Sequence, residues 1–110
     1  MGGNRMIEVN KNNFETEVLE SDRPVIVDFW GPSCQPCLNL MPDVEGLAET
    51  YSEKVKVVKL NSVENRRVCI NHRVMGLPSF LMFKEGKEIK RISGGEITKE
   101  DIENLIKENI

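Results

Sequence analysis

Two cysteines separated by two residues are the part of this sequence best suited to chemistry. Cys34 and Cys37 follow a turn at residues 31–33 and begin a segment whose apolar residues have helical spacing. Cysteines three apart at the start of a helix lie on one face, close enough for a disulfide to form and break. The free N–H groups and the dipole of the first turn stabilise a thiolate, and Cys34 gains most from them. The spacing predicts dithiol–disulfide exchange, in which Cys34 attacks a substrate disulfide and the more buried Cys37 resolves the mixed disulfide.

An acidic residue inside an apolar strand is the second unusual feature. Asp28 interrupts a β-branched and aromatic run at residues 25–30 that leads directly to the cysteines. Because burial disfavours a charged carboxylate, we expect Asp28 to have a raised pKa and to exchange a proton with a thiol near neutral pH. Lys59, on the next predicted strand, could reach this carboxylate with its stem buried and partly neutralise it. The alternatives are an edge-strand Asp28 that faces water and a Lys59 that is a plain surface residue.

Alternating strands and helices must position these groups. The apolar pattern predicts five strands, at residues 7–9, 25–30, 55–60, 79–83 and 88–93. It also predicts four helices: one after residues 10–13, a long one over 34–51 kinked at Pro42, a short one capped by Ser62, and one with a capping box at Thr98. The order indicates an α/β fold with helices on both faces of the sheet. In such folds reactive groups lie where a strand leads into a helix, and the cysteines occupy one of these loops.

Composition limits the class of protein. The chain has 110 residues, a formal net charge of -3 and three cysteines, an odd number that does not describe a disulfide scaffold. We expect one domain over residues 7–110 after a flexible tail at residues 1–6. The acidic balance argues against nucleic-acid binding, and no apolar stretch is long enough for a membrane helix. The N-terminus lacks the apolar core of a secretory signal, so we expect a cytoplasmic protein with free thiols.

Several motifs together resemble the thioredoxin family. They are Val-Asp-Phe-Trp at 27–30, Cys-Gln-Pro-Cys at 34–37, Pro42, Lys-Leu-Asn at 59–61, Gly-Leu-Pro-Ser at 76–79, Phe-Lys-Glu-Gly at 83–86 and Gly94. Their spacing matches the family over essentially all of residues 7–110. The resemblance implies the thioredoxin fold, which is an α/β fold with a central five-stranded mixed sheet flanked by four helices.

The resemblance also implies an activity and its partners. Cys34 would be the nucleophile and Cys37 the resolving thiol, with Asp28 as the buried proton acceptor and Lys59 as its partner. The chain would reduce protein disulfides as a monomer, without a bound cofactor. A thioredoxin-reductase-type flavoprotein would donate the electrons, and client proteins with disulfides would accept them.

A substrate groove beside the cysteines is the third implication. Pro78 matches the cis-proline of the family, and the backbone of Leu77 would pair with a bound substrate strand. Trp30 would pack beside the site, and Gly94 would line the groove.

Two residues depart from the usual family motif, Trp-Cys-Gly-Pro-Cys. Ser33 replaces the tryptophan, which predicts a smaller and more polar partner surface. Gln35 replaces the glycine and adds a donor and an acceptor near the sulfurs, so Gln35 and Pro36 are expected to tune the redox potential. The retained Pro36, with no histidine between the cysteines, favours a reductant over an oxidase or isomerase.

Two alternative functions remain open at this point. Residues 69–72 form a CxxH, so Cys69 and His72 could join the cysteine pair as zinc ligands. Against zinc, the short helix with Cys69 is expected on the sheet face opposite the long helix. We expect no metal, a Cys69 that packs as a small buried residue, and a His72 that favours the negative end of its helix dipole. The other alternative is a non-catalytic adaptor of the same fold, which the joint presence of both cysteines, Asp28 and Pro78 disfavours.

Overall fold

The computed structural model describes residues 6–110, which form one five-stranded sheet covered by helices. The strands are β1 (Ile7–Val9), β2 (Val25–Trp30), β3 (Lys56–Asn61), β4 (Ser79–Lys84) and β5 (Lys87–Ser93). Their spatial order is β1-β3-β2-β4-β5. β1, β3 and β2 run parallel, whereas β4 is antiparallel to β2 and β5 is antiparallel to β4. The predicted mixed sheet is confirmed.

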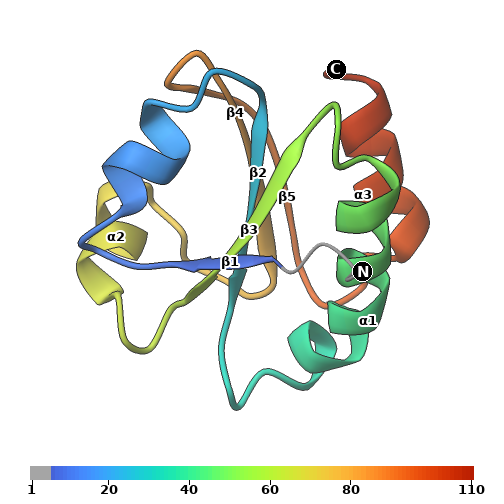
Figure 1. The fold of residues 1–110 in the computed structure, drawn as a ribbon. Helices are drawn as coiled ribbons and strands as arrows, with labels where there is room; N and C mark the ends of the chain where they lie inside the picture. Colours follow the sequence, from blue (N-terminus) through green and yellow to red (C-terminus); the bar gives the residue numbers. More distant parts are fainter. Residues whose placement is uncertain (1–5) are drawn as a thin grey trace.

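The helices lie on both faces of the sheet. They are η1 (Glu15–Leu19), α1 (Gln35–Thr50), α2 (Arg66–Asn71) and α3 (Lys99–Lys107). Figure 1 shows η1 and α2 together on one face and α1 and α3 together on the other. Four flanking helices were predicted, and this prediction is confirmed. None of the helices within residues 6–110 is long and apolar enough to cross a membrane.

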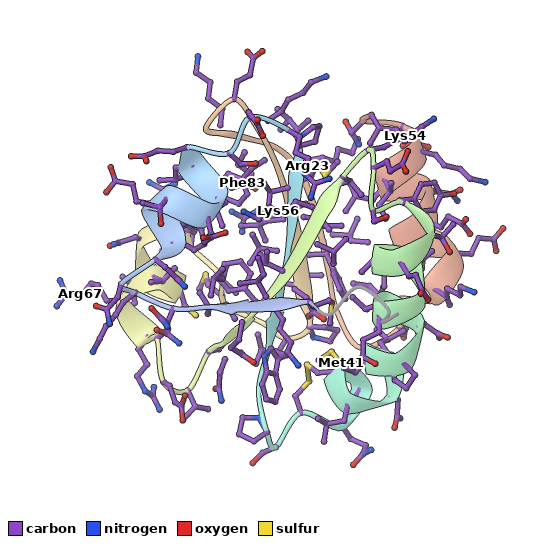
Figure 2. The ribbon with its side chains drawn as sticks, viewed as in Figure 1. Arg23, Met41, Lys54, Lys56, Arg67 and Phe83 are labelled. Carbon is purple, nitrogen blue, oxygen red and sulfur yellow. A yellow bond between two sulfur atoms is a disulfide. The ribbon has the colours of Figure 1, made fainter. Side chains whose placement is uncertain are left out.

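The central strand β2 divides its side chains between two hydrophobic cores. Val25, Val27 and Phe29 belong to the core under η1 and α2, and Ile26 belongs to the core under α1 and α3. Side chains alternate along a strand, so Asp28 lies on the same face as Ile26. The sheet therefore presents Asp28 to the face that α1 covers. On the other face, Phe83 of β4 points toward η1 (Figure 2).

Helix α1 forms where the spacing predicted it. Its buried residues, at helical spacing, are Cys37, Val44, Leu47 and Ala48. They pack on the sheet, and burial of such a stripe supplies most of the stability of an amphipathic helix. Pro42 lies inside the helix and is exposed. The kink at Pro42 stays a prediction.

Two of the four helices differ in detail from the sequence-based expectation. η1 is a single π-helical turn, closed by a 2.9 Å hydrogen bond from the Glu20 N–H to the Glu15 carbonyl. The expectation that Ser62 caps the next helix is wrong, because α2 begins at Arg66 after Asn65. The buried Asn65 ties distant loops together: its Oδ1 accepts from the Lys11 N–H at 2.8 Å. This contact joins residues 54 apart in the chain and attaches the residue before α2 to the loop after β1.

The ends of the chain agree with the expected pattern where they are described. Thr98 and Asp101 form the predicted capping box of α3, with reciprocal hydrogen bonds of 2.9 and 3.2 Å. Residues 1–5 of the predicted flexible tail lie outside the described residues. Met6 packs against the core under α1 and α3.

Candidate active site

The cysteine pair lies at the N-terminus of α1. Cys34 is the N-cap residue, and its Sγ accepts a hydrogen bond from the Cys37 N–H at 3.3 Å. The two residues are joined by a disulfide, with 5.3 Å between their Cα atoms. Cys34 is partly exposed, whereas Cys37 is only 1 % exposed. The pair therefore has one sulfur that a partner can reach and one that the protein encloses.

The loop before α1 holds Cys34 in this position. The Cys34 N–H donates to the Gly31 carbonyl at 3.0 Å, which closes a tight turn at the end of β2. Pro36 lies in the first turn of the helix, where a missing N–H costs no hydrogen bond. The Gln35 side chain donates to Asn39 Oδ1 at 2.8 Å, one turn along the helix. Its amide is thus engaged along the exposed side of α1.

Asp28 is buried beneath this end of the fold. It is 1 % exposed, and its Oδ1 has no hydrogen-bond partner within residues 6–110. Burial raises the pKa of Asp28 from 3.8 to about 7, with Lys59 lowering it and Glu8 raising it by smaller amounts. Asp28 pairs with Phe80 of β4 on one side and Lys59 of β3 on the other. The alternative of a water-facing edge residue is wrong, since β2 is the middle strand of the sheet.

Lys59 is oriented toward a residue that the sequence had not singled out. Its Nζ lies 3.9 Å from Glu8 Oε1 and 5.8 Å from the centre of the Trp30 ring. The Trp30 indole Nε1 donates to Glu8 Oε2 at 3.2 Å. Lys59 is 24 % exposed, and its ion pair among the described residues is with Glu8, not with Asp28. Glu8 looked like an ordinary polar residue on a short strand, and only the pairing of β1 with β3 places it here.

Two further loops border the cysteine loop. The Leu77–Pro78 peptide bond is cis, as the resemblance implied. The Gly94 N–H donates to the Pro78 carbonyl at 3.0 Å, so the loop after β5 is attached to the cis-proline. A Cβ at Gly95 would lie 3.5 Å from Pro36 Cγ, which places this loop against the first turn of α1.

The cysteine loop and the cis-proline loop are also in contact. A Cβ added at Gly31 would lie 3.2 Å from Leu77 Cδ1, so this position has little room for a side chain. Leu77 is partly buried and Gly94 is exposed. The structure thus brings Leu77, Pro78 and Gly94 together beside the cysteine loop, whereas the contacts of the Trp30 ring are with Glu8 and Lys59.

The residues of the zinc hypothesis do not converge. Cys69 is a free, buried cysteine in the core under η1 and α2, whereas Cys37 begins the helix on the opposite face. Within residues 6–110, no group of three or more His, Cys, Asp or Glu side chains is placed to hold a metal ion. Cys69 has the packing role that was predicted for it.

His72 lies at the end of α2, as predicted, and it also packs in an aromatic cluster. Its ring lies 4.9 Å from Phe14 and 5.6 Å from Phe83 between centroids. Burial lowers the pKa of His72, with Glu88 opposing this change and Arg91 adding to it. The expected stabilisation by the helix dipole stays a prediction.

A disulfide with one accessible and one enclosed sulfur, closed at the start of a helix, is the arrangement that thiol–disulfide oxidoreductases use. The family model for thioredoxin matches residues 5–108 of the chain. The chain is 39% identical to thioredoxin from Acetoanaerobium sticklandii over 105 residues, which cover 96% of this chain and 100% of the relative. It is 36% identical to thioredoxin from Peptoclostridium acidaminophilum over 105 residues, covering 96% of each.

The chain belongs to the thioredoxin family. With the Cys34–Cys37 pair in place, it is a protein-disulfide reductase that works by dithiol–disulfide exchange. This membership agrees with the resemblance seen in the sequence motifs.

Proposed function

We propose that the two cysteines have unequal, ordered roles. The Cys34 thiolate attacks one sulfur of a client disulfide, and the other client sulfur leaves as a thiolate. Cys37 then gives its proton to the Asp28 carboxylate and attacks the sulfur of Cys34. The bond between Cys34 and the client sulfur breaks, and the client leaves with both sulfurs reduced. Its thiolates take up protons from Asp28 and from water, and the Cys34–Cys37 disulfide remains. Two electrons pass from the cysteine pair to the client.

The contrast in burial between the two sulfurs carries this proposal. Cys34 is partly exposed and stands at the N-terminus of α1, where the Cys37 N–H already donates to its Sγ at 3.3 Å. This hydrogen bond and the helix dipole favour a thiolate at Cys34. Cys37 is 1 % exposed, and burial disfavours its thiolate, so its attack needs a base.

Asp28 is the residue best suited to be that base. It is buried on the sheet face that α1 covers, and its pKa of about 7 allows it to gain and lose a proton near neutral pH. Its Oδ1 has no competing hydrogen bond within the described chain. Lys59 partly offsets the effect of burial on Asp28, and we propose that its supporting role is to keep the raised pKa of Asp28 near neutral rather than higher.

The three loops around the cysteines would bind the client. In this proposal the backbone of Leu77 beside Pro78 pairs with an extended client segment, in the manner of an added strand. Trp30 and Gly94 line the same groove, and the Ser33 side chain makes it more polar than a tryptophan would. Gln35 and Pro36 tune the redox potential through the first turn of α1.

The last part of the proposal concerns the electron donor, the oligomeric state and the cell compartment. A thioredoxin-reductase-type flavoprotein would return the Cys34–Cys37 disulfide to the dithiol, and the chain would act as a monomer in the cytoplasm. No bound cofactor is needed for this cycle, since the two sulfurs carry both electrons. The family match supports, in general terms, a cycle of disulfide clients and a reductase.

Insulin reduction with dithiothreitol as electron source tests the proposal. The unmodified chain should accelerate precipitation of the insulin B chain, and Cys34→Ser should lose this acceleration. Cys37→Ser should also lose turnover but should accumulate a mixed disulfide. Cys69→Ser is the matched control, because it removes a thiol outside the site. A rate no better than that of dithiothreitol alone would favour the adaptor, and equal accumulation of the mixed disulfide in both active-site variants would refute the roles.

A further inference from the structure

Glu8, Lys59 and Asp28 lie in one row across three neighbouring strands. Glu8 of β1 pairs with Lys59 of β3, and Lys59 pairs with Asp28 of β2. Residues in register on adjacent strands point to the same face of the sheet. Lys59 therefore lies between Glu8 and Asp28 and could form an ion pair with either of them. One acid is at the edge of the sheet, and the other is at its centre.

The structure shows which acid holds Lys59. The Lys59 ammonium lies 3.9 Å from Glu8 Oε1, and the second oxygen of Glu8 accepts the indole N–H of Trp30 at 3.2 Å. The same ammonium lies 5.8 Å from the centre of the Trp30 ring, where a cation is attracted to the ring face. Glu8 and Trp30 together thus orient Lys59 toward the edge of the sheet, while Asp28 Oδ1 has no partner within residues 6–110.

Apart from Lys59 and Glu8, few charged or titratable side chains surround Asp28. β4 contributes Phe80, which is uncharged, and β3 and β1 contribute Lys59 and Glu8. Of the buried residues of α1, only Cys37 titrates, once the disulfide is reduced. Glu8 and Lys59 are therefore the charges through which the surroundings of Asp28 can be adjusted.

We propose that Glu8 is a positioning residue for disulfide reduction, which acts by drawing Lys59 toward the edge of the sheet and so limiting how strongly Lys59 stabilises the Asp28 carboxylate. The proposal rests on the role given above to Asp28 as the proton acceptor for Cys37. If Lys59 turned to Asp28, it would stabilise the carboxylate, and a stabilised carboxylate is a weaker base. Held by Glu8, Lys59 leaves Asp28 able to take up the proton that Cys37 releases.

A Glu8→Gln variant tests this by direct titration of Asp28. The glutamine removes the charge that holds Lys59 but keeps an oxygen that can accept the Trp30 N–H. In the oxidised protein, carboxyl carbon NMR with labelled aspartate should show the pKa of Asp28 falling by about 0.5 to 1 pH unit. Glu53 is exposed in the loop before β3, so Glu53→Gln is the matched charge control. It should change the pKa of Asp28 by no more than about 0.2 pH unit. An Asp28 titration in Glu8→Gln that coincides with that of the unmodified chain overturns the proposal.

Two further variants separate this inference from the proposed function. In a Lys59→Gln background, Glu8→Gln should lower the pKa of Asp28 by less than half as much, because Glu8 acts mainly through Lys59. An undiminished change in that background overturns the positioning role. Asp28→Asn addresses the proposed function instead. If Asp28→Asn resolves mixed disulfides as fast as the unmodified chain, Asp28 is not the base, whatever Glu8 does to its titration.

Discussion

Replacing Asp28 by asparagine should change how the stability of the oxidised protein depends on pH. The pKa of Asp28 is raised by burial from 3.8 to about 7, so the unfolded chain releases this proton at lower pH than the folded chain does. The folded state then binds more protons than the unfolded state, and its stability falls as pH rises from about 4 through about 7. At about 1.36 kcal/mol per pKa unit, the full loss above pH 7 is about 4 kcal/mol.

Guanidinium unfolding between pH 4 and pH 8.5, followed by circular dichroism, measures this loss. Other carboxylates titrate alike in both proteins, so the difference in unfolding free energy isolates Asp28. As pH rises over this range, the free energy of unfolding of the unmodified chain should fall by about 4 kcal/mol more than that of Asp28→Asn. A buried asparagine amide without partners costs about 1–3 kcal/mol at every pH, so the change of the difference with pH is the test, not its absolute value.

The exposed Asp22→Asn variant is the control for loss of one carboxylate. A difference between Asp28→Asn and the unmodified chain that stays flat from pH 4 to pH 8.5 would refute the reasoning. It would mean that the buried carboxyl does not titrate near neutral pH, and the proposed proton transfer from Cys37 would lose its basis.

Two other substitutions probe the scaffold around the site. Thr98→Ala removes the Thr98 side chain from the α3 capping box and should lower the free energy of unfolding, measured in urea, by about 1 kcal/mol. An unchanged midpoint of urea unfolding would show that the 3.2 Å hydrogen bond from the Asp101 N–H to Thr98 contributes nothing to stability. Cys69→Ala leaves a small cavity in the core under η1 and α2, so about 1 kcal/mol of stability should be lost while insulin reduction is retained. A fall in reductase rate with Cys69→Ala would contradict the packing role.

Much of the site could be predicted because its signals are local. The turn at residues 31–33 and the helical spacing of the apolar residues that follow place both cysteines at the start of a helix. The apolar run from Val25 to Phe29 is broken only by Asp28 and indicated a strand buried on both faces, which made Asp28 conspicuous as a buried acid. Only the motif resemblance, which includes Pro78, could add the groove, since its loops are far apart in the chain.

The features that the sequence did not show depend on contacts between distant segments. Glu8 acquires its place only through the parallel register of β1 with β3, which no local pattern encodes. The residue before α2 is Asn65, whose side chain bonds to the Lys11 backbone, and not Ser62, which the local sequence favoured. The aromatic packing of His72 likewise arises from side chains on η1 and β4. In each case, the position of the residue depends on contacts with segments that are distant in the sequence.

The central claim is that Cys34 attacks first and Cys37 resolves, and trapping of the mixed disulfide tests it most directly. The Cys34→Ser and Cys37→Ser variants are each reacted with a client disulfide, and the adducts are located by peptide mass mapping. We predict a stable adduct on Cys34 in the Cys37→Ser protein and little adduct on Cys37 in the Cys34→Ser protein. Equal adducts on both cysteines, or an adduct found on Cys37 alone, would contradict the account.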